Sequence, residues 1–506
     1  MKTQFLSALA ATAALTLAAT PALADAHMEK AATPAATITP QVRTTQHSGT
    51  FGGIRVPYTA TIAETVLSSD ANDPRGTPEA VIVTTSYVKS PRDKTRPVFF
   101  IYNGGPGSGS VWLQMGAFGP KRVAIPSDAR DDGAPPYPLL DNPDSLLDVA
   151  DLVFIDPPGT GFSYLTEGTD PEKYYGLRQD ARAVAEVIRR WINDNGRWSS
   201  PKYLGGESYG TSRTAMVVDE LEGATYSDVG LNGLILISTI LDFAAREPTP
   251  GNEMAYVVTL PNMAAAASFH GKIEAPSVEA IAAEARRFAI GPFASALLKG
   301  QDLPPTERAA VRAELARLTG LSETYLDRAN LRVTSQRFYK ELLRDRGLTI
   351  GRLDARYTGI DYDNAGEYPD ADPSFYGIDA GYTAAINQWA REDLGFETDR
   401  AYNSIGREPG RNWDWSLEEQ GRNAYLNVAP FIGKAMRQNS GLRVFNAQGW
   451  YDFATPFFGA EYSLNRIGIP QERVTYRYYD AGHMMYVRDE DRAQLSTDLR
   501  AFIRAR

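Results

Sequence analysis

The sequence predicts an α/β fold with a doubly wound, mostly parallel sheet and a mostly helical insertion. Short apolar runs bounded by turn residues alternate with stretches of 3.6-residue apolar period. Strand-like runs then return near the C-terminus, after a long segment of different character. The simplest account is one core, residues 48–244 and 426–506, interrupted by an insertion at 245–425. The alternative, two separate domains, would leave the last two strands without a sheet.

The core elements follow in order. Alternating residues such as Ala80–Val88 predict antiparallel strands at the entry to the core. The period of Leu177–Asn195 predicts a helix. Short apolar runs predict buried parallel strands at Val98–Tyr102, Leu152–Ile155, Lys202–Leu204 and Leu231–Ile237, and strands return at Leu442–Asn446 and Val474–Tyr479 before a last helix, Arg492–Arg506.

The insertion is predicted to contain amphipathic helices at Ser277–Lys299 and Thr306–Thr319. An irregular, tyrosine-rich stretch follows from Tyr357 to Tyr382. Its aromatic side chains either line a substrate cleft or pack the irregular region, and both interpretations stay open.

The N-terminus predicts export to the periplasm or the medium. Lys2, the apolar run Phe5–Ala19 and a small-residue triplet ending at Ala24 are typical of a signal peptide, residues 1–24. The run is short for a membrane span of about 20 residues, so no span is expected. Residues 25–47 are rich in Ala, Thr and Pro, which predicts a flexible tether.

Composition excludes several classes of protein. The net charge of -10 offers no basic surplus for nucleic acid. The absence of cysteine excludes disulfides and thiolate metal sites. The four histidines have no metal-binding spacing, so we expect neither a metal nor a cofactor.

A candidate nucleophile lies in Gly206–Gly210, which follows a predicted strand and precedes a helix beginning at Thr211. G-x-S-x-G at such a turn exposes a strained serine, here Ser208, and its glycines relieve crowding. An ordinary glycine-rich turn would show the same pattern. The catalytic interpretation therefore depends on finding a base and an acid.

One histidine is suitably placed. His27 and His47 lie in the predicted tether and His270 in the insertion, whereas His483 directly follows a core strand. Asp452 follows the preceding strand, although an aspartate there could also cap a turn.

Serine, acid and histidine in this order are typical of an α/β-hydrolase fold. The sequence therefore predicts Ser208 as nucleophile, His483 as base and Asp452 as the residue that orients it. The residue after the nucleophile and the glycine-rich loop Asn103–Ser110 are expected to form an oxyanion hole. A phosphate loop fits less well, because the G-K-[ST] ending is absent.

The motifs together resemble the serine carboxypeptidases, as an exported bacterial member of that family. Five similar segments occur in family order within residues 98–504: Tyr102–Gly107, Asp156–Ser163, Gly206–Gly210, Gly449–Asp452 and Gly482–Met484. The resemblance implies an α/β-hydrolase with a helical cap that removes C-terminal residues from peptides.

The resemblance also implies binding roles. The backbone N–H groups of Gly105 and Tyr209 would form the oxyanion hole, and Asn103 and Glu207 would hold the substrate's terminal carboxylate. Two carboxyl groups at hydrogen-bond distance must share a proton, so peptide binding is expected to weaken as pH rises.

Five positions depart from the family pattern. Ile101 replaces Trp, Ala117 replaces Glu, Ser108 replaces Cys, Trp450 replaces Asp and Tyr486 replaces Pro. The Glu normally supports the carboxylate-binding network, so the resemblance implies hydrolase chemistry more directly than it implies exopeptidase specificity. An esterase or acyltransferase on the same scaffold, and a catalytically silent binding protein, remain alternatives.

Overall fold

A computed structural model describes residues 38–70, 76–223, 228–246, 248–421, 425–466 and 468–505. The predicted signal peptide and residues 25–37 of the predicted tether lie outside the described residues. Within the described residues, ten strands form one sheet in the order β1-β2-β3-β7-β4-β9-β10-β13-β14, with β8 (Tyr164–Leu165) beside β3.

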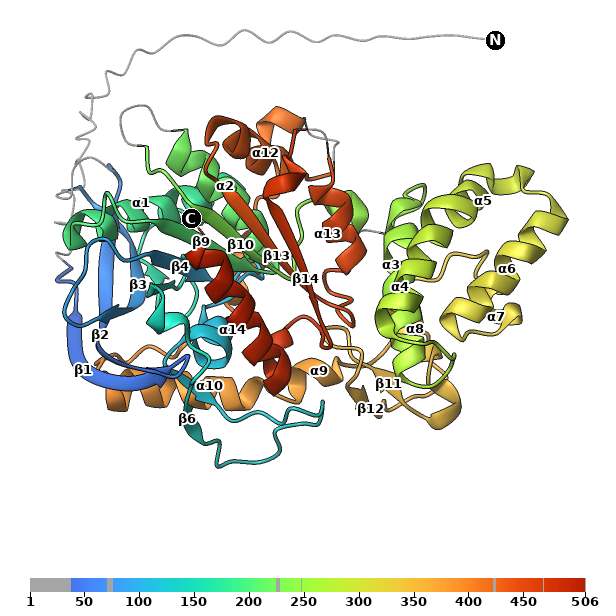
Figure 1. The fold of residues 1–506 in the computed structure, drawn as a ribbon, viewed down its shortest axis with the longest axis horizontal. Helices are drawn as coiled ribbons and strands as arrows, with labels where there is room; N and C mark the ends of the chain where they lie inside the picture. Colours follow the sequence, from blue (N-terminus) through green and yellow to red (C-terminus); the bar gives the residue numbers. More distant parts are fainter. Residues whose placement is uncertain are drawn as a thin grey trace, which may run out of the picture. The chain divides into compact units, whose positions relative to one another are not determined.

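The sheet begins antiparallel and becomes parallel. The strands β1 (Val42–Phe51), β2 (Ile54–Ser68) and β3 (Pro78–Lys89) pair antiparallel, and so do β3 and β7 (Asp151–Ile155). From β7 onward every pairing is parallel, through β4 (Val98–Tyr102), β9 (Lys202–Glu207), β10 (Gly233–Ile237), β13 (Arg443–Gly449) and β14 (Val474–Tyr479). The prediction of a mostly parallel sheet is confirmed (Figure 1).

The prediction of a tether is wrong at its C-terminal end, because Val42–His47 belong to β1. These residues pair with β2 in continuous register, and every second one is half-buried. His47 stacks on Tyr58 with ring centroids 5.4 Å apart. The alternating side chains are mostly polar, so the sequence carries little of the apolar pattern that identifies a strand.

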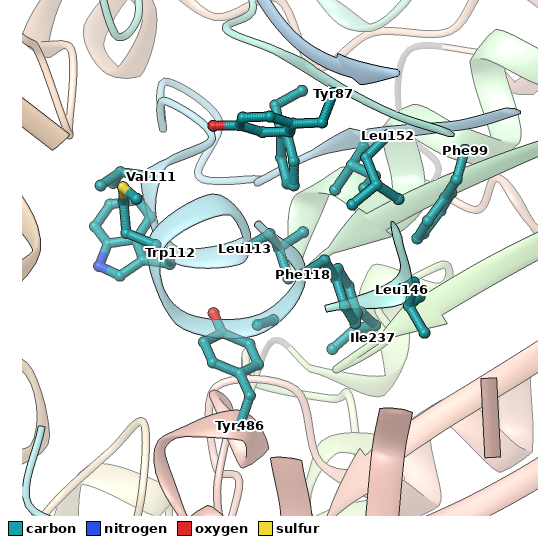
Figure 2. Packing of buried hydrophobic residues seen from close by; sticks show 14 of the residues in the cluster. Tyr87, Phe99, Val111, Trp112, Leu113, Phe118, Leu146, Leu152, Ile237 and Tyr486 are labelled. Carbon is teal, nitrogen blue, oxygen red and sulfur yellow. The ribbon is translucent and has the colours of Figure 1, made fainter. Parts of the chain in front are cut away.

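Each face of the parallel sheet is covered by helices. Successive residues of β4 point to opposite faces: Phe99 and Ile101 belong to one buried cluster, and Phe100 belongs to the other. The first cluster includes α14 (Asp489–Arg504) and the π-helical turn η1 (Leu113–Phe118), with Leu152, Ile237 and Tyr486 packed nearby (Figure 2). The second includes α1 (Leu177–Asn195), α2 (Tyr209–Glu222) and α12 (Ala429–Gln438). The core is therefore doubly wound.

Between β10 and β13 the chain leaves the sheet and forms a mostly helical segment, drawn in light green, yellow and orange in Figure 1. Besides α12, its α-helices of six or more residues are α3 (Met254–Phe269), α4 (Val278–Phe288), α5 (Ala294–Lys299), α6 (Pro305–Thr319), α7 (Glu323–Arg328), α8 (Ser335–Glu341), α10 (Asp379–Asn387) and α11 (Arg407–Asn412). The stretch 277–299, predicted as one helix, is two helices joined by a π turn that contains Pro292. Proline has no backbone N–H, so it cannot donate the hydrogen bond that would continue a regular α-helix.

The irregular stretch of this segment contains short elements. A hairpin of β11 (Thr349–Ile350) and β12 (Thr358–Gly359) precedes the single turn α9 (Pro373–Tyr376). A third apolar cluster joins the helices α3–α8 to Trp450, Phe453 and Phe457, which follow β13. None of the helices among the described residues has the length and apolar composition that crossing a bilayer requires.

Candidate active site

Ser208 lies at the sharp turn between β9 and α2. It adopts a φ of 60°, a left-handed conformation that costs a residue with a side chain about 1–3 kcal/mol. A Cβ on Gly206 would lie 2.0 Å from the carbonyl oxygen of Gly210, so no larger residue fits at that position. The turn is fixed by a 2.9 Å hydrogen bond from the Ser208 N–H to the Ile237 carbonyl. The local geometry therefore presents the serine side chain beyond the end of the sheet.

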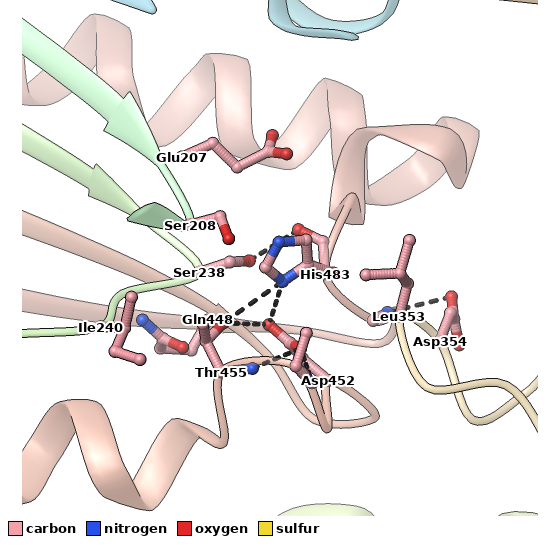
Figure 3. Close-up of polar contacts among 12 residues, drawn as sticks. Glu207, Ser208, Ser238, Ile240, Leu353, Asp354, Gln448, Asp452, Thr455 and His483 are labelled. Carbon is pink, nitrogen blue, oxygen red and sulfur yellow. Dashed lines mark hydrogen bonds and ion pairs between the residues drawn. The ribbon is translucent and has the colours of Figure 1, made fainter. Parts of the chain in front are cut away.

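Asp452 and His483 are brought together by the loops that follow β13 and β14. The Nδ1 atom of His483 lies 2.8 Å from Oδ2 of Asp452, and both side chains are buried. A Cβ on Gly449 would lie 2.1 Å from the Gly482 carbonyl oxygen, which shows how closely the two loops pack. Figure 3 shows the Ser208 hydroxyl directed toward the His483 ring from the side opposite Asp452. The three predicted residues thus converge in the required order.

The Asp452 carboxylate is surrounded by donors. Its Oδ1 accepts from the backbone N–H groups of Ala454, at 2.8 Å, and Thr455, at 3.0 Å. Its Oδ2 accepts from the Thr455 hydroxyl at 2.6 Å as well as facing His483. These contacts fix the carboxylate, and the carboxylate in turn fixes the imidazole with a proton on Nδ1. The other ring nitrogen is then free to act as a base toward Ser208.

The backbone of His483 is held by groups far away in the sequence. Its N–H donates to the Leu353 carbonyl at 2.6 Å, and its carbonyl accepts from the Ser238 hydroxyl at 2.6 Å. The preceding N–H, of Gly482, donates to Oδ2 of Asp354 at 3.0 Å. The segment between β10 and β13 therefore contributes directly to the position of the histidine.

Two opposing effects act on the pKa of His483. Burial disfavours the charged imidazolium, but the neighbouring Asp452 carboxylate and its hydrogen bond favour it more strongly. The balance raises the pKa of His483 above its ordinary value of 6.5. An imidazole of raised basicity is well suited to accept a serine proton near neutral pH.

The glycine-rich loop after β4 packs against the turn that holds Ser208. A Cβ on Gly104 would lie 2.6 Å from the backbone nitrogen of Tyr209, so the two backbones are in direct contact. Gly105 has a φ of 100°, which favours glycine. Within the described residues, neither the Gly105 nor the Tyr209 N–H donates a hydrogen bond to the protein. Both groups are available to an oxyanion beside Ser208.

Glu207 and Asn103 form a buried polar pair next to the serine. Oε2 of Glu207 accepts a 2.6 Å hydrogen bond from the Tyr486 hydroxyl. Burial raises the pKa of Glu207 to about 7, an effect only partly offset by nearby His483 and by hydrogen bonds from Tyr486 and Asn103. Oδ1 of Asn103 accepts from the Leu113 N–H at 3.1 Å, which directs its amide NH2 away from that helix end. Glu207 can therefore be a neutral donor at neutral pH.

Two cavities meet at Ser208. The first, of about 380 Å³, is lined by Asn103, Gly104, Gly105, Ser108, Trp112, Glu207, Ser208, Arg352, Leu353, Asp372, Phe375, Ile405, His483 and Met484. The second, of about 220 Å³, is lined by Gly105, Ser208, Tyr209, Ile240, Phe243, Arg246, Arg352, Trp415, Ala454 and Thr455. His483 and Glu207 face the first cavity, while aromatic side chains line the second.

The five residues that depart from the family pattern lie in different surroundings. Ile101 is fully buried in β4, and Ala117 is buried in the turn η1. Ser108 lines the first cavity. Trp450 stacks on Tyr478 with ring centroids 4.5 Å apart, away from both cavities. Tyr486 alone among the five forms a hydrogen bond to a predicted site residue.

The other described histidines are structural. His47 packs in β1, and Nε2 of His270 lies 2.7 Å from the Ala355 carbonyl oxygen. His27 lies outside the described residues. In the described part of the chain, no three His, Cys, Asp or Glu side chains group in a way that could hold a metal ion.

Sequence reasoning missed the supporting residues Thr455, Ser238, Leu353, Asp354 and Arg352. Thr455 is three residues from Asp452, so a local turn pattern could have indicated it. The others come from distant segments and have no local pattern.

Comparison with known proteins finds similarity to the serine carboxypeptidases over part of the chain. A family model described as serine carboxypeptidase matches residues 86–270. Serine carboxypeptidase-like 3 of Arabidopsis thaliana is 28% identical over 176 residues, which cover 33% of this chain and 38% of that protein. The pheromone-processing carboxypeptidase KEX1 of Ogataea parapolymorpha is 32% identical over 136 residues, which cover 26% of this chain and 20% of that protein. The matched segment thus spans less than half the length of these relatives.

A solved structure extends the similarity of fold to most of the chain. The prohormone-processing carboxypeptidase from Saccharomyces cerevisiae superposes with a TM-score of 0.52 at 14% identity, covering 88% of this chain and 90% of that one. Together with the sheet order and the serine turn, this confirms the predicted α/β-hydrolase fold. The predicted resemblance to the family is confirmed as well.

Proposed function

We propose that this member of the serine carboxypeptidase family is a serine-type carboxypeptidase that removes C-terminal residues from peptides through an acyl-enzyme intermediate. The observation that carries the proposal is the 2.8 Å contact between His483 and Asp452, facing Ser208 across the ring. The adjoining cavity contains Asn103 and a Glu207 that is readily protonated. Hydrolase chemistry and carboxylate recognition are therefore supported side by side.

The residues define a sequence of proton transfers. Ser208 Oγ attacks the scissile carbonyl carbon while Nε2 of His483 accepts its proton, and Asp452 stabilises the resulting imidazolium. The N–H groups of Gly105 and Tyr209 receive the negative charge on the carbonyl oxygen. The intermediate collapses as the C–N bond breaks and His483 returns the proton to the leaving amine. Water, deprotonated by His483, then cleaves the serine ester by the same steps and restores Ser208.

The position of His483 supports an assignment of the two cavities to the two sides of the substrate. The leaving amine must lie near the histidine that protonates it, and His483 lines the first cavity. The C-terminal residue of the substrate is therefore placed there, and the acyl side of the substrate in the second cavity. Phe375, Ile405 and Arg352 line the first cavity from the segment between β10 and β13. That segment, residues 245–425, acts as a cap insertion over the site.

Asn103 and Glu207 would bind the terminal carboxylate. A neutral Glu207 donates a hydrogen bond to it, whereas an ionised Glu207 repels it. With the pKa of Glu207 near 7, binding is strongest below that pH and weakens above it.

The test uses benzyloxycarbonyl-Phe-Leu and mass spectrometry of the products. Wild-type protein should release free leucine, and Ser208→Ala should release none. Ser463→Ala is a matched control, because Ser463 is also a buried serine that donates to a backbone carbonyl, that of Gly459 at 2.7 Å, but lines neither cavity. Cleavage of aryl esters without any release of leucine would favour an esterase or acyltransferase instead.

Export is also proposed, from the composition of residues 1–24. Expression of the whole chain in a host with a secretory pathway should give a protein whose first residue is Asp25, as measured by N-terminal sequencing. Retention of Met1 in the purified protein would contradict this proposal.

A further inference from the structure

Arg352 lies where the two cavities meet, since it lines both of them together with Ser208 and Gly105. It follows β11 in the loop of the small hairpin. Both backbone polar groups of Arg352 are hydrogen-bonded. Its N–H donates to Oδ1 of Asp372 at 3.0 Å, and its carbonyl accepts from the Phe453 N–H at 3.1 Å. The start of the side chain is therefore held in place beside the reacting centre.

The guanidinium group of Arg352 is exposed and makes no hydrogen bond or ion pair with any described residue. The neighbouring carboxylate of Asp372 is occupied by backbone N–H groups of Arg352, Leu353 and Ser374. By contrast, Arg356 in the same loop is buried and paired with Asp354 at 2.6 Å. The five donors of Arg352 thus face the cavities without a partner from the described chain.

No carboxylate of the described residues around the site pairs with the Arg352 guanidinium, although Asp372 lines the same cavity. The carboxylate of Asp452 is directed at His483 and Thr455, and Glu207 is neutral below a pH of about 7. A planar guanidinium matches the geometry of a carboxylate and can bind it through two hydrogen bonds.

We infer that Arg352 recognises a carboxylate of the substrate at the junction of the two cavities. This inference rests on the proposed function, because that function places peptide on both sides of Ser208. The carboxylate has two possible sources: the free C-terminus in the first cavity, or an acidic side chain on the acyl side in the second. Arg352 is then a residue that determines specificity and takes no part in proton transfer.

The test measures peptide binding by calorimetry in a Ser208→Ala background, so that turnover does not interfere. Four ligands are compared: benzyloxycarbonyl-Phe-Leu, its C-terminal amide, benzyloxycarbonyl-Glu-Leu and benzyloxycarbonyl-Gln-Leu. The variants are Arg352→Gln and Arg352→Lys, with Arg287→Gln as the control. Arg287 is an exposed arginine on α4 that lines neither cavity, and its replacement removes the same charge.

Arg352→Gln should weaken binding of the peptide whose carboxylate contacts Arg352 by about fivefold, and Arg352→Lys should weaken it by less. Loss of the preference for free acid over amide assigns the C-terminus, and loss of the preference for Glu over Gln assigns the acyl side chain. The two measured ratios are the affinity for the free acid over the amide and the affinity for the Glu peptide over the Gln peptide. If neither ratio changes by more than about twofold relative to Arg287→Gln, the inference is wrong. Release of leucine by the wild-type enzyme would then leave the proposed function standing. Absence of both binding and leucine release would contradict the two together.

Discussion

The hydroxyl of Tyr486 lies 2.6 Å from Oε2 of Glu207, and both side chains are buried close to Ser208. Tyr486 follows His483 by three residues, so one loop supplies both the base and the partner of Glu207. Because Glu207 also lines the first cavity, the tyrosine holds one oxygen of a carboxyl group that a ligand in that cavity can reach. The pH dependence of substrate binding is therefore expected to depend on a tyrosine that does not touch the reacting bond.

Replacing Tyr486 with Phe should extend peptide binding to higher pH. The Tyr486 hydroxyl donates to the ionised form of Glu207 and favours it, so its loss raises the pKa of Glu207 above about 7. A hydrogen bond to a charged group corresponds to roughly one pH unit. The midpoint of the rise in KM for benzyloxycarbonyl-Phe-Leu should move upward accordingly, with kcat for a simple ester unchanged.

Tyr479→Phe provides the control for that measurement. Tyr479 is also a buried tyrosine bonded to a carboxylate, Asp498, at 3.0 Å, but it lines neither cavity. Its KM profile should match the wild type. A downward shift of the midpoint in Tyr486→Phe would contradict the assigned direction of the hydrogen bond.

Glu207→Gln should remove the pH dependence of peptide binding. In the proposed function the protonated carboxyl group binds the substrate, so wild-type binding is expected to be complete below the pKa of about 7 and to be lost as pH rises through it. A carboxamide donates at every pH. KM for the blocked dipeptide should then be flat between about pH 5 and pH 9, while an ester lacking the carboxylate is unaffected. A wild-type KM that is itself flat over this range would exclude the role of Glu207.

Asp452→Asn should lower kcat for both peptide and ester by about 10⁴-fold. Its carboxylate accepts from Ala454, Thr455 and His483, and a carboxamide cannot satisfy all these donors while keeping the Nδ1 proton of His483. The loss of the remaining activity in acid should also move to lower pH, because Asp452 raises the pKa of His483 above 6.5 and the variant lacks this carboxylate. The wild-type activity is present above the raised pKa and is lost as pH falls through it. Steady-state rates across pH check both effects, and less than a tenfold loss would be inconsistent with the assigned role.

Asp354→Ala should destabilise the protein by about 3 kcal/mol, because it leaves the buried Arg356 guanidinium unpaired. It also removes the contact to Gly482, so kcat should fall by about tenfold. The double variant Asp354→Ala/Arg356→Leu should recover stability but not kcat. Urea denaturation and ester hydrolysis measure the two quantities separately. Recovery of both would show that the contact to Gly482 does not position His483.

The fold, and the convergence of Ser208, Asp452 and His483, could be predicted because their patterns are local. The apolar run of β4, the strand-like run of β14 and the helix Leu177–Asn195 occur at the predicted residues. Ser208 lies in a motif whose glycines are required by contacts as short as 2.0 Å. The strand β1 was missed because its half-buried residues are polar.

The supporting residues could not be predicted, because only the folded chain brings them together. Arg352 and Asp354 lie about a hundred residues from either neighbouring core strand and reach the site through a loop with no periodic pattern. Tyr486 was visible as a departure from the family, but its contact with Glu207 depends on the packing around Gly116, where a Cβ would lie 2.8 Å from the tyrosine ring. Such contacts follow from tertiary structure alone.

Reaction with a fluorophosphonate probe, followed by peptide mass spectrometry, tests the central claim most directly. The account predicts one modified serine, Ser208, with labelling lost in Ser208→Ala and reduced in Asp452→Asn but retained in Ser463→Ala. Labelling absent from Ser208 in the folded wild-type protein, or found on another serine instead, would contradict the assignment of Ser208 as the nucleophile.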